Sequence, residues 1–148
     1  MAGKAGLKAG LIGLAVLLAM TLINQLLPIS GGLVYALCGV NMLIYAGIGV
    51  LAGFFLAPPR AAGTGAGAGA IAGLISGVVN GVVGYVITAI RMARGMGLPG
   101  VTPQQMQQLA ESGMDPMMLA IPGAICGMAI GSGLAAIGGA IVAAVKPD

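Results

Sequence analysis

The sequence contains no histidine and no tryptophan, and only three acidic residues among its 148. Histidine is the most frequent general base and metal ligand, so catalysis and metal binding lack their usual side chain. The two cysteines, Cys38 and Cys126, fall inside apolar stretches, where we interpret them as small packing residues rather than as a disulfide or a metal site. The chain has no nucleophile–base pair and no phosphate-binding loop. We therefore expect no enzymatic activity, no catalytic residue and no bound metal.

Charged residues are scarce as well. They make up 6% of the chain, whereas a soluble domain carries about 25%. Hydrophobic residues reach 59%, and the mean hydropathy is +1.09. So little polar surface cannot cover a core in water, and the composition predicts an integral membrane protein. We expect membrane lipid around it and no nucleic-acid partner.

Four apolar runs are long enough to cross a bilayer, which takes roughly 20 residues in helical form. Pro28 and Pro58 follow the first two runs and are typical of helix ends. These signals predict a single all-α transmembrane domain over residues 1–148. It is a four-helix bundle with helices at about residues 5–27, 33–56, 65–94 and 117–145.

The connection between the third and fourth runs, which contains "TPQQMQQLAES", is more polar. Thr102 is a good N-cap, Pro103 suits the first helical position, and Gly113 is a typical stop. The pattern predicts a short helix at about residues 103–112, lying at the membrane surface or against a partner.

An even number of spans places both chain ends on one side of the membrane, together with the connection between the second and third helices. The basic residues of that side are Lys4, Lys8, Arg60 and Lys146. The other side has Arg91 and Arg94, which we interpret as interfacial anchors at the end of the third helix. Because basic residues favour the cytoplasmic side, both termini are predicted to be cytoplasmic.

The most regular feature of the chain is the spacing of its glycines. Residues four apart form a ridge on one helix face, and a ridge of small residues lets another backbone approach closely, which holds helices together in lipid. The ridge of the third helix is Gly65, Gly69, Gly73, Gly77 and Gly81, and that of the fourth is Gly123, Gly127, Gly131, Ala135 and Gly139. Shorter versions are Ala5, Ala9 and Gly13 in the first helix, and Gly49 and Gly53 in the second. We predict glycine-zipper packing, within the chain or between subunits.

Two of these segments, "LPISGG" and "LAPPRAAGTGAGAGAIAGLISG", resemble small multi-pass glycine-zipper membrane proteins of unknown function in prokaryotes. The resemblance covers the first three helices and rests on low-complexity residues. It implies a multi-pass protein of the prokaryotic cytoplasmic membrane, and it implies no activity.

Few polar residues lie inside the predicted spans, among them Asn24, Asn41 and Asn80. We interpret them as interhelical hydrogen-bonding groups, the alternative being that Asn41 and Asn80 line a narrow polar path. The leading hypothesis is a non-enzymatic accessory or scaffold subunit that packs against other membrane subunits of a larger complex. The alternative is a homo-oligomeric channel or small-solute pore, built from copies of the chain itself. No cofactor is expected. Whether the chain binds a specific lipid is left open.

Overall fold

The chain folds into a bundle of long helices with one short helix beside it. The computed structural model describes residues 2–26, 32–98, 101–113 and 116–146. Its helices are α1 (Ala2–Leu26), α2 (Gly32–Phe54), α3 (Ala62–Ala93), α4 (Pro103–Glu111) and α5 (Pro116–Val145). All except α4 are long and apolar enough to cross a membrane. The prediction of an all-α protein with four candidate membrane-spanning helices, and a short helix before the last of them, is confirmed.

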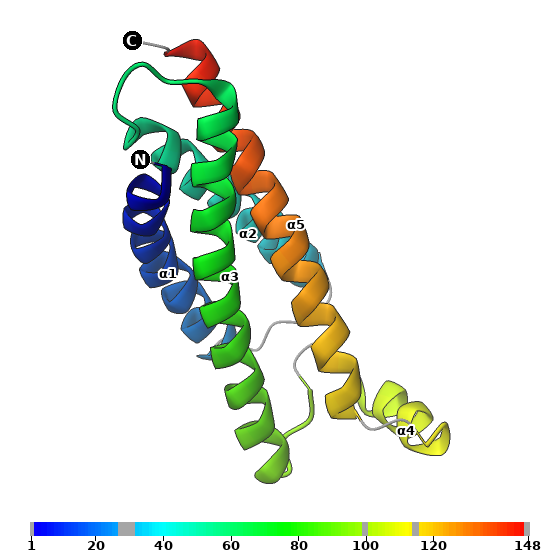
Figure 1. Ribbon diagram of the computed structural model, residues 1–148. Helices are drawn as coiled ribbons and strands as arrows, with labels where there is room; N and C mark the ends of the chain where they lie inside the picture. Colours follow the sequence, from blue (N-terminus) through cyan, green and yellow to red (C-terminus); the bar gives the residue numbers. More distant parts are fainter. Residues whose placement is uncertain (1, 27–31, 99–100, 114–115, 147–148) are drawn as a thin grey trace.

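The two helices α2 and α3 form the centre of the bundle. Each contacts the other and both outer helices, whereas α1 and α5 share no contact within the described residues. Figure 1 shows α3 between α1 and α5, with α2 crossing behind it and the two chain ends at the same end of the molecule. The short helix α4 contacts α5 and lies beside the opposite end of the bundle.

Local hydrogen bonds explain where α3 and α4 begin. The hydroxyl of Thr64 donates to the Ala61 carbonyl oxygen at 2.7 Å and accepts from the Ala61 N–H at 3.3 Å, so α3 begins at Ala62 rather than near residue 65. Ahead of α4, the Thr102 hydroxyl accepts from the Gln105 N–H at 3.3 Å, and the Gln105 side chain accepts from the Thr102 N–H at 2.9 Å. This reciprocal pair satisfies two backbone donors that the first helical turn leaves open.

The core consists of small residues, and large apolar side chains point outward. Ala9, Ala72 and Ala135 are fully buried, whereas Leu43 is 73% exposed and Ile125 is 59% exposed. In water this distribution would be unfavourable, but surrounding hydrocarbon accepts such side chains at no cost. Close contact between helix backbones is then the main interaction available to hold the helices together.

Candidate functional site

The most extensive contact between two helices of the described residues lies where α3 meets α5. A Cβ atom added at Gly65 would overlap the carbonyl oxygen of Gly139, and one added at Gly69 would overlap that of Ala135. The reverse holds too, since a Cβ at Gly139 would overlap the carbonyl oxygen of Gly65. The two backbones therefore touch here with no side chain between them.

Further along the same contact, toward α4, side chains enter the space between the two helices. A Cβ at Gly73 would still lie 2.8 Å from the Cα of Ser132. At Gly77 and Gly81 the nearest α5 atoms belong to Met128, whose side-chain atoms would lie 3.5 Å and 3.1 Å from the added Cβ. The contact thus changes from backbone against backbone to backbone against a flexible side chain.

The α5 ridge does not face α3 along its whole length. Gly131 faces the ring of Tyr45 on α2, which would lie 2.8 Å from an added Cβ. Gly127 is exposed, and no described atom lies within 4 Å of the corresponding Cβ position. The surroundings of Gly123 lie outside the described residues. The structure therefore brings Gly131, Ala135 and Gly139 to the bundle interior and leaves Gly127 on its surface.

A second small-residue contact joins α1 to α3. A Cβ at Gly6 would lie 2.7 Å from the carbonyl oxygen of Ala68, and one at Gly10 would lie 3.3 Å from the Cα of Ala72. Sequence reasoning singled out Ala5, Ala9 and Gly13 in this helix, and all three are buried. It missed Gly6 and Gly10, although their four-residue spacing, matched by Ala68 and Ala72, was a usable signal.

A third contact brings α2 against α5. A Cβ at Gly49 would overlap the carbonyl oxygen of Ala135, and a Cβ at Gly138 would lie 2.5 Å from that of Ala46. Because Gly69 of α3 faces the same Ala135 carbonyl, two helices meet α5 at this one peptide group.

The three asparagines lie in the half of the bundle nearer α4. The Thr21 hydroxyl donates to the side-chain oxygen of Asn80 at 2.7 Å and so joins α1 to α3. The side-chain oxygen of Asn24 is buried and has no hydrogen-bond partner among the described residues. Asn41 is exposed on α2. Of the three, only Asn80 makes an interhelical hydrogen bond within the described part of the chain.

Two of these asparagines continue stripes that are buried elsewhere in the bundle. Asn41 lies four residues before the buried Tyr45, and Asn80 lies four residues after the buried Ser76, so each shares a helix face with a core residue. Figure 1 shows α3 and α5 diverging here, and no described atom lies within 4 Å of a Cβ placed at Gly84. We call the half of the bundle that carries Asn24, Asn41, Asn80 and Gly84 the open half.

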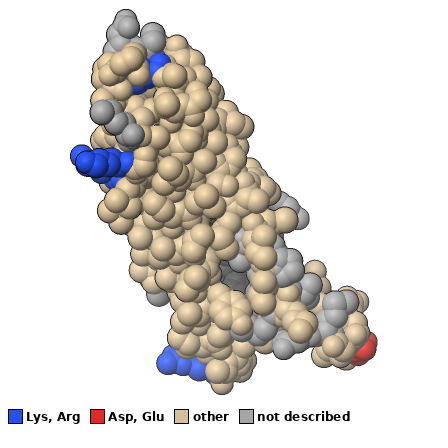
Figure 2. Space-filling model, viewed as in Figure 1, with Lys and Arg blue, Asp and Glu red and all other residues tan. Residues whose placement is uncertain are grey.

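Charged side chains lie toward the two ends of the bundle, with an uncharged belt between them (Figure 2). We name the end that carries both chain termini the basic end, and its basic residues are Lys4, Lys8, Arg60 and Lys146. There the Arg60 guanidinium donates to the Lys146 carbonyl oxygen at 3.2 Å, and the Lys146 ammonium lies 5.1 Å from the centre of the Phe54 ring. At the other end of α3, Arg91 is half-buried and Arg94 is exposed.

The α3–α5 contact predicts a position-specific effect of added volume. Gly69→Leu should lower the free energy of unfolding by about 3 kcal/mol, because the new side chain must push the Ala135 peptide away. Gly67→Leu is the matched control, since no described atom lies within 4 Å of its Cβ position on the same helix. Unfolding in mixed micelles by titration with dodecyl sulfate, followed by circular dichroism, measures both variants. Equal stability of the two would contradict the contact.

The Thr21–Asn80 hydrogen bond predicts a coupling between α1 and α3. Thr21→Val and Asn80→Leu, measured singly and together, should show a coupling free energy of about 0.6 kcal/mol, the average for such bonds between membrane helices. The same unfolding assay provides the values. Strictly additive effects of the two substitutions would show that the bond does not form.

No group of three or more histidine, cysteine, aspartate or glutamate side chains that could hold a metal ion occurs among the described residues. Comparison of the chain with models of protein families, with curated protein sequences and with solved structures found no match.

Proposed function

We propose that the chain is a non-enzymatic accessory subunit that packs against other membrane proteins within a larger complex. The observation that carries the proposal is the exposed amide of Asn41. Asn41 lies near the middle of α2, a candidate membrane span, so in a bilayer its side chain would lie where water does not reach. A polar group left without a hydrogen bond in hydrocarbon is costly, and a polar side chain of a neighbouring protein would remove that cost.

The open half offers room for such a neighbour. Gly84 lies on α3 seven residues after Gly77 and so continues the face that meets α5, but α5 has diverged from α3 at this level. A helix of another membrane protein can approach the α3 backbone closely there, extending the kind of contact seen at Gly65 and Gly69.

The glycine contacts within the bundle also support a scaffold role. Glycine-zipper packing would hold α1, α2, α3 and α5 in place relative to one another through their backbones, and the bundle would then present its open half as a preformed surface. Away from the ends of the spans, residues 9–54, 62–90 and 117–145 carry no Asp, Glu, Lys, Arg or His of the kind that ion-coupled transporters and proton relays use. Positioning a partner protein is a role that needs no such group.

The distribution of basic residues favours one orientation of the chain in the membrane. The basic end carries four basic residues against Arg91 and Arg94 at the other, which supports a cytoplasmic location for the basic end and for both termini. With the resemblance to prokaryotic multi-pass proteins, this favours the cytoplasmic membrane of a prokaryote as the location. The open half and α4 would then face the outer side.

Association in the open half predicts which substitutions release the partner. Extracted from its native membrane in mild detergent, the chain should run in native mass spectrometry as part of a particle that contains other polypeptides. Asn41→Leu or Gly84→Leu should reduce the share of chain in that particle at least tenfold without lowering stability, since neither position is packed within the described residues. Gly67→Leu, also unpacked but on the tight half of α3, should leave the particle intact. A chain that runs alone with lipid would contradict the proposal.

The same exposed amide favours a second candidate, a homo-oligomeric pore. If copies of the chain met through their open halves, the Asn41 amides would face one another around a shared polar path. The particle mass would then be a whole multiple of 14.3 kDa plus lipid.

For the pore, purified chain in a planar bilayer should conduct ions or small solutes. Asn41→Leu should reduce the unit conductance severalfold, because it replaces a polar lining group by an apolar one. Leu43→Ala, at an exposed position two residues away and on the other side of α2, is the matched control and should conduct normally. An oligomer that blocks every tested solute would eliminate this candidate.

A further inference from the structure

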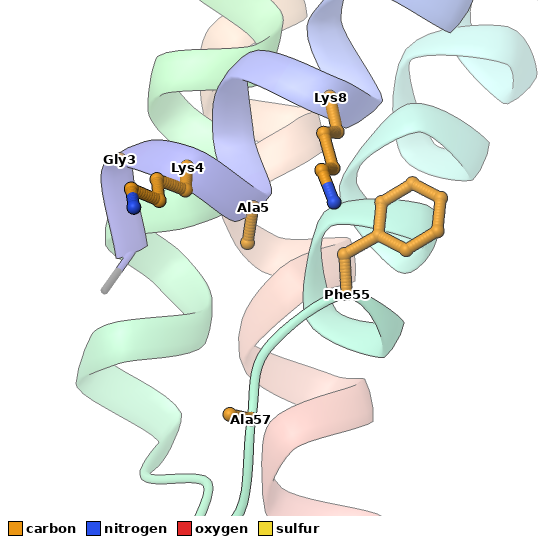
Figure 3. Close-up of a pocket in the computed structure, with 6 residues that line it drawn as sticks. All are labelled: Gly3, Lys4, Ala5, Lys8, Phe55 and Ala57. Carbon is orange, nitrogen blue, oxygen red and sulfur yellow. The ribbon is translucent and has the colours of Figure 1, made fainter.

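A pocket of about 530 Å³ lies at the basic end, between the beginning of α1 and the segment that follows α2. Its lining residues are Gly3, Lys4, Ala5, Lys8, Phe55 and Ala57. Figure 3 shows the Lys8 ammonium directed toward Phe55, while the Lys4 side chain extends to the other side of the helix start. Two cations therefore flank a space whose remaining walls are apolar.

The electrostatic surroundings of the pocket are positive. α1 begins at Ala2 and has no acidic residue in its first turn, so nothing there offsets the positive end of its helix dipole. Arg60 and Lys146 add positive charge at the same end of the bundle. Glu111, the acidic residue within the described part of the chain, lies on α4 beside the opposite end. An anion entering the pocket meets attraction from lysines and from helix N–H groups together.

Exposed apolar side chains on the same two segments favour one kind of anion. Leu7 and Leu11 follow Lys4 and Lys8 by three residues on α1 and so lie near them on the helix surface, and their side chains are exposed. Phe54 ends α2, Phe55 follows it and lines the pocket, and both of these side chains are exposed as well. A free phosphate ion would gain nothing from them. A phospholipid would place its phosphate between the lysines and lay its acyl chains along these side chains, as expected for a site at the boundary between hydrocarbon and water.

We propose that this pocket binds the headgroup of an anionic phospholipid, with its phosphate beside the Lys8 ammonium and attracted by the charge of Lys4. The site lies at the end of the bundle opposite the open half, so it does not depend on the accessory-subunit proposal. It gives the chain a lipid contact at the level where α1, the α2–α3 connection and the end of α5 come together.

Native mass spectrometry of the full chain in mild detergent, with added phosphatidylglycerol or phosphatidylcholine, tests the site. Phosphatidylglycerol should bind more tightly than phosphatidylcholine. Lys4→Gln with Lys8→Gln should weaken phosphatidylglycerol binding about 25-fold, since each basic side chain near an anionic headgroup contributes roughly a fivefold change. Arg91→Gln with Arg94→Gln removes the same amount of charge from the opposite end and should leave the binding unchanged.

A substitution that fills the pocket provides a test independent of charge. Gly3→Leu adds a side chain at a position where no described atom lies within 4 Å of the Cβ, so the fold should tolerate it while the pocket loses its volume. Gly63→Leu, equally unpacked at the beginning of α3 and outside the pocket lining, is the matched control. Thermal unfolding followed by circular dichroism verifies that both variants are folded. Gly3→Leu should reduce phosphatidylglycerol binding at least tenfold, and Gly63→Leu should not.

Three results would overturn the proposal. The first is equal binding of the two lipids. The second is equal loss of binding in both double variants, which would show that the total charge of the chain matters and the pocket does not. The third is displacement of phosphatidylglycerol by millimolar inorganic phosphate, which would identify a site for the free ion.

Discussion

The contact between the α3 and α5 backbones is the constraint from which the rest of the bundle follows. With no side chain at Gly65, Gly69 or Gly139, the two helices come together until peptide groups touch. The Ala135 carbonyl then also meets Gly49, which fixes α2 against the same stretch of α5. α1 packs on the neighbouring small residues of α3 and shares no described contact with α5. The positions of α2 and α1 therefore both depend on the α3–α5 pair.

This packing divides the molecule into two unlike halves. At the basic end the helices are close, and the Arg60 and Lys146 contacts tie the α2–α3 connection to the end of α5. In the open half the same helices diverge, and polar groups that a tight core would have to satisfy are left partly unsatisfied, as at Asn24 and Asn41. A polar group without a hydrogen bond is costly in hydrocarbon, and a neighbouring molecule that supplies the missing bond would remove this cost. The two proposals, a protein partner at one end and a lipid headgroup at the other, follow from this division.

Much of the fold could be predicted from the sequence, because hydropathy and proline report directly on spans and their ends. Glycine spacing indicated which faces are small, but not which helix each face meets. α3 carries two adjacent small ridges, and the assignment of one to α5 and the other, through Ala68 and Ala72, to α1 depends on crossing angles that residue types do not encode. The exposure of Asn41 was unpredictable for the same reason, since it depends on where α5 diverges. The pocket unites residues of α1 with Phe55 and Ala57, and only the folded chain places them together.

Glycine is the smallest residue, and this limits how the interior of the bundle can change over generations. Every missense mutation of a glycine codon adds at least a Cβ atom, so at Gly49, Gly65, Gly69 and Gly139 each such mutation pushes two helices apart. The lipid-facing leucines, isoleucines and valines can exchange freely among themselves, because hydrocarbon accepts any of them. Inherited variation in this chain should therefore concentrate on its outer faces. A water-soluble protein also varies mostly at its surface, but there the surface must stay polar, whereas here it must stay apolar.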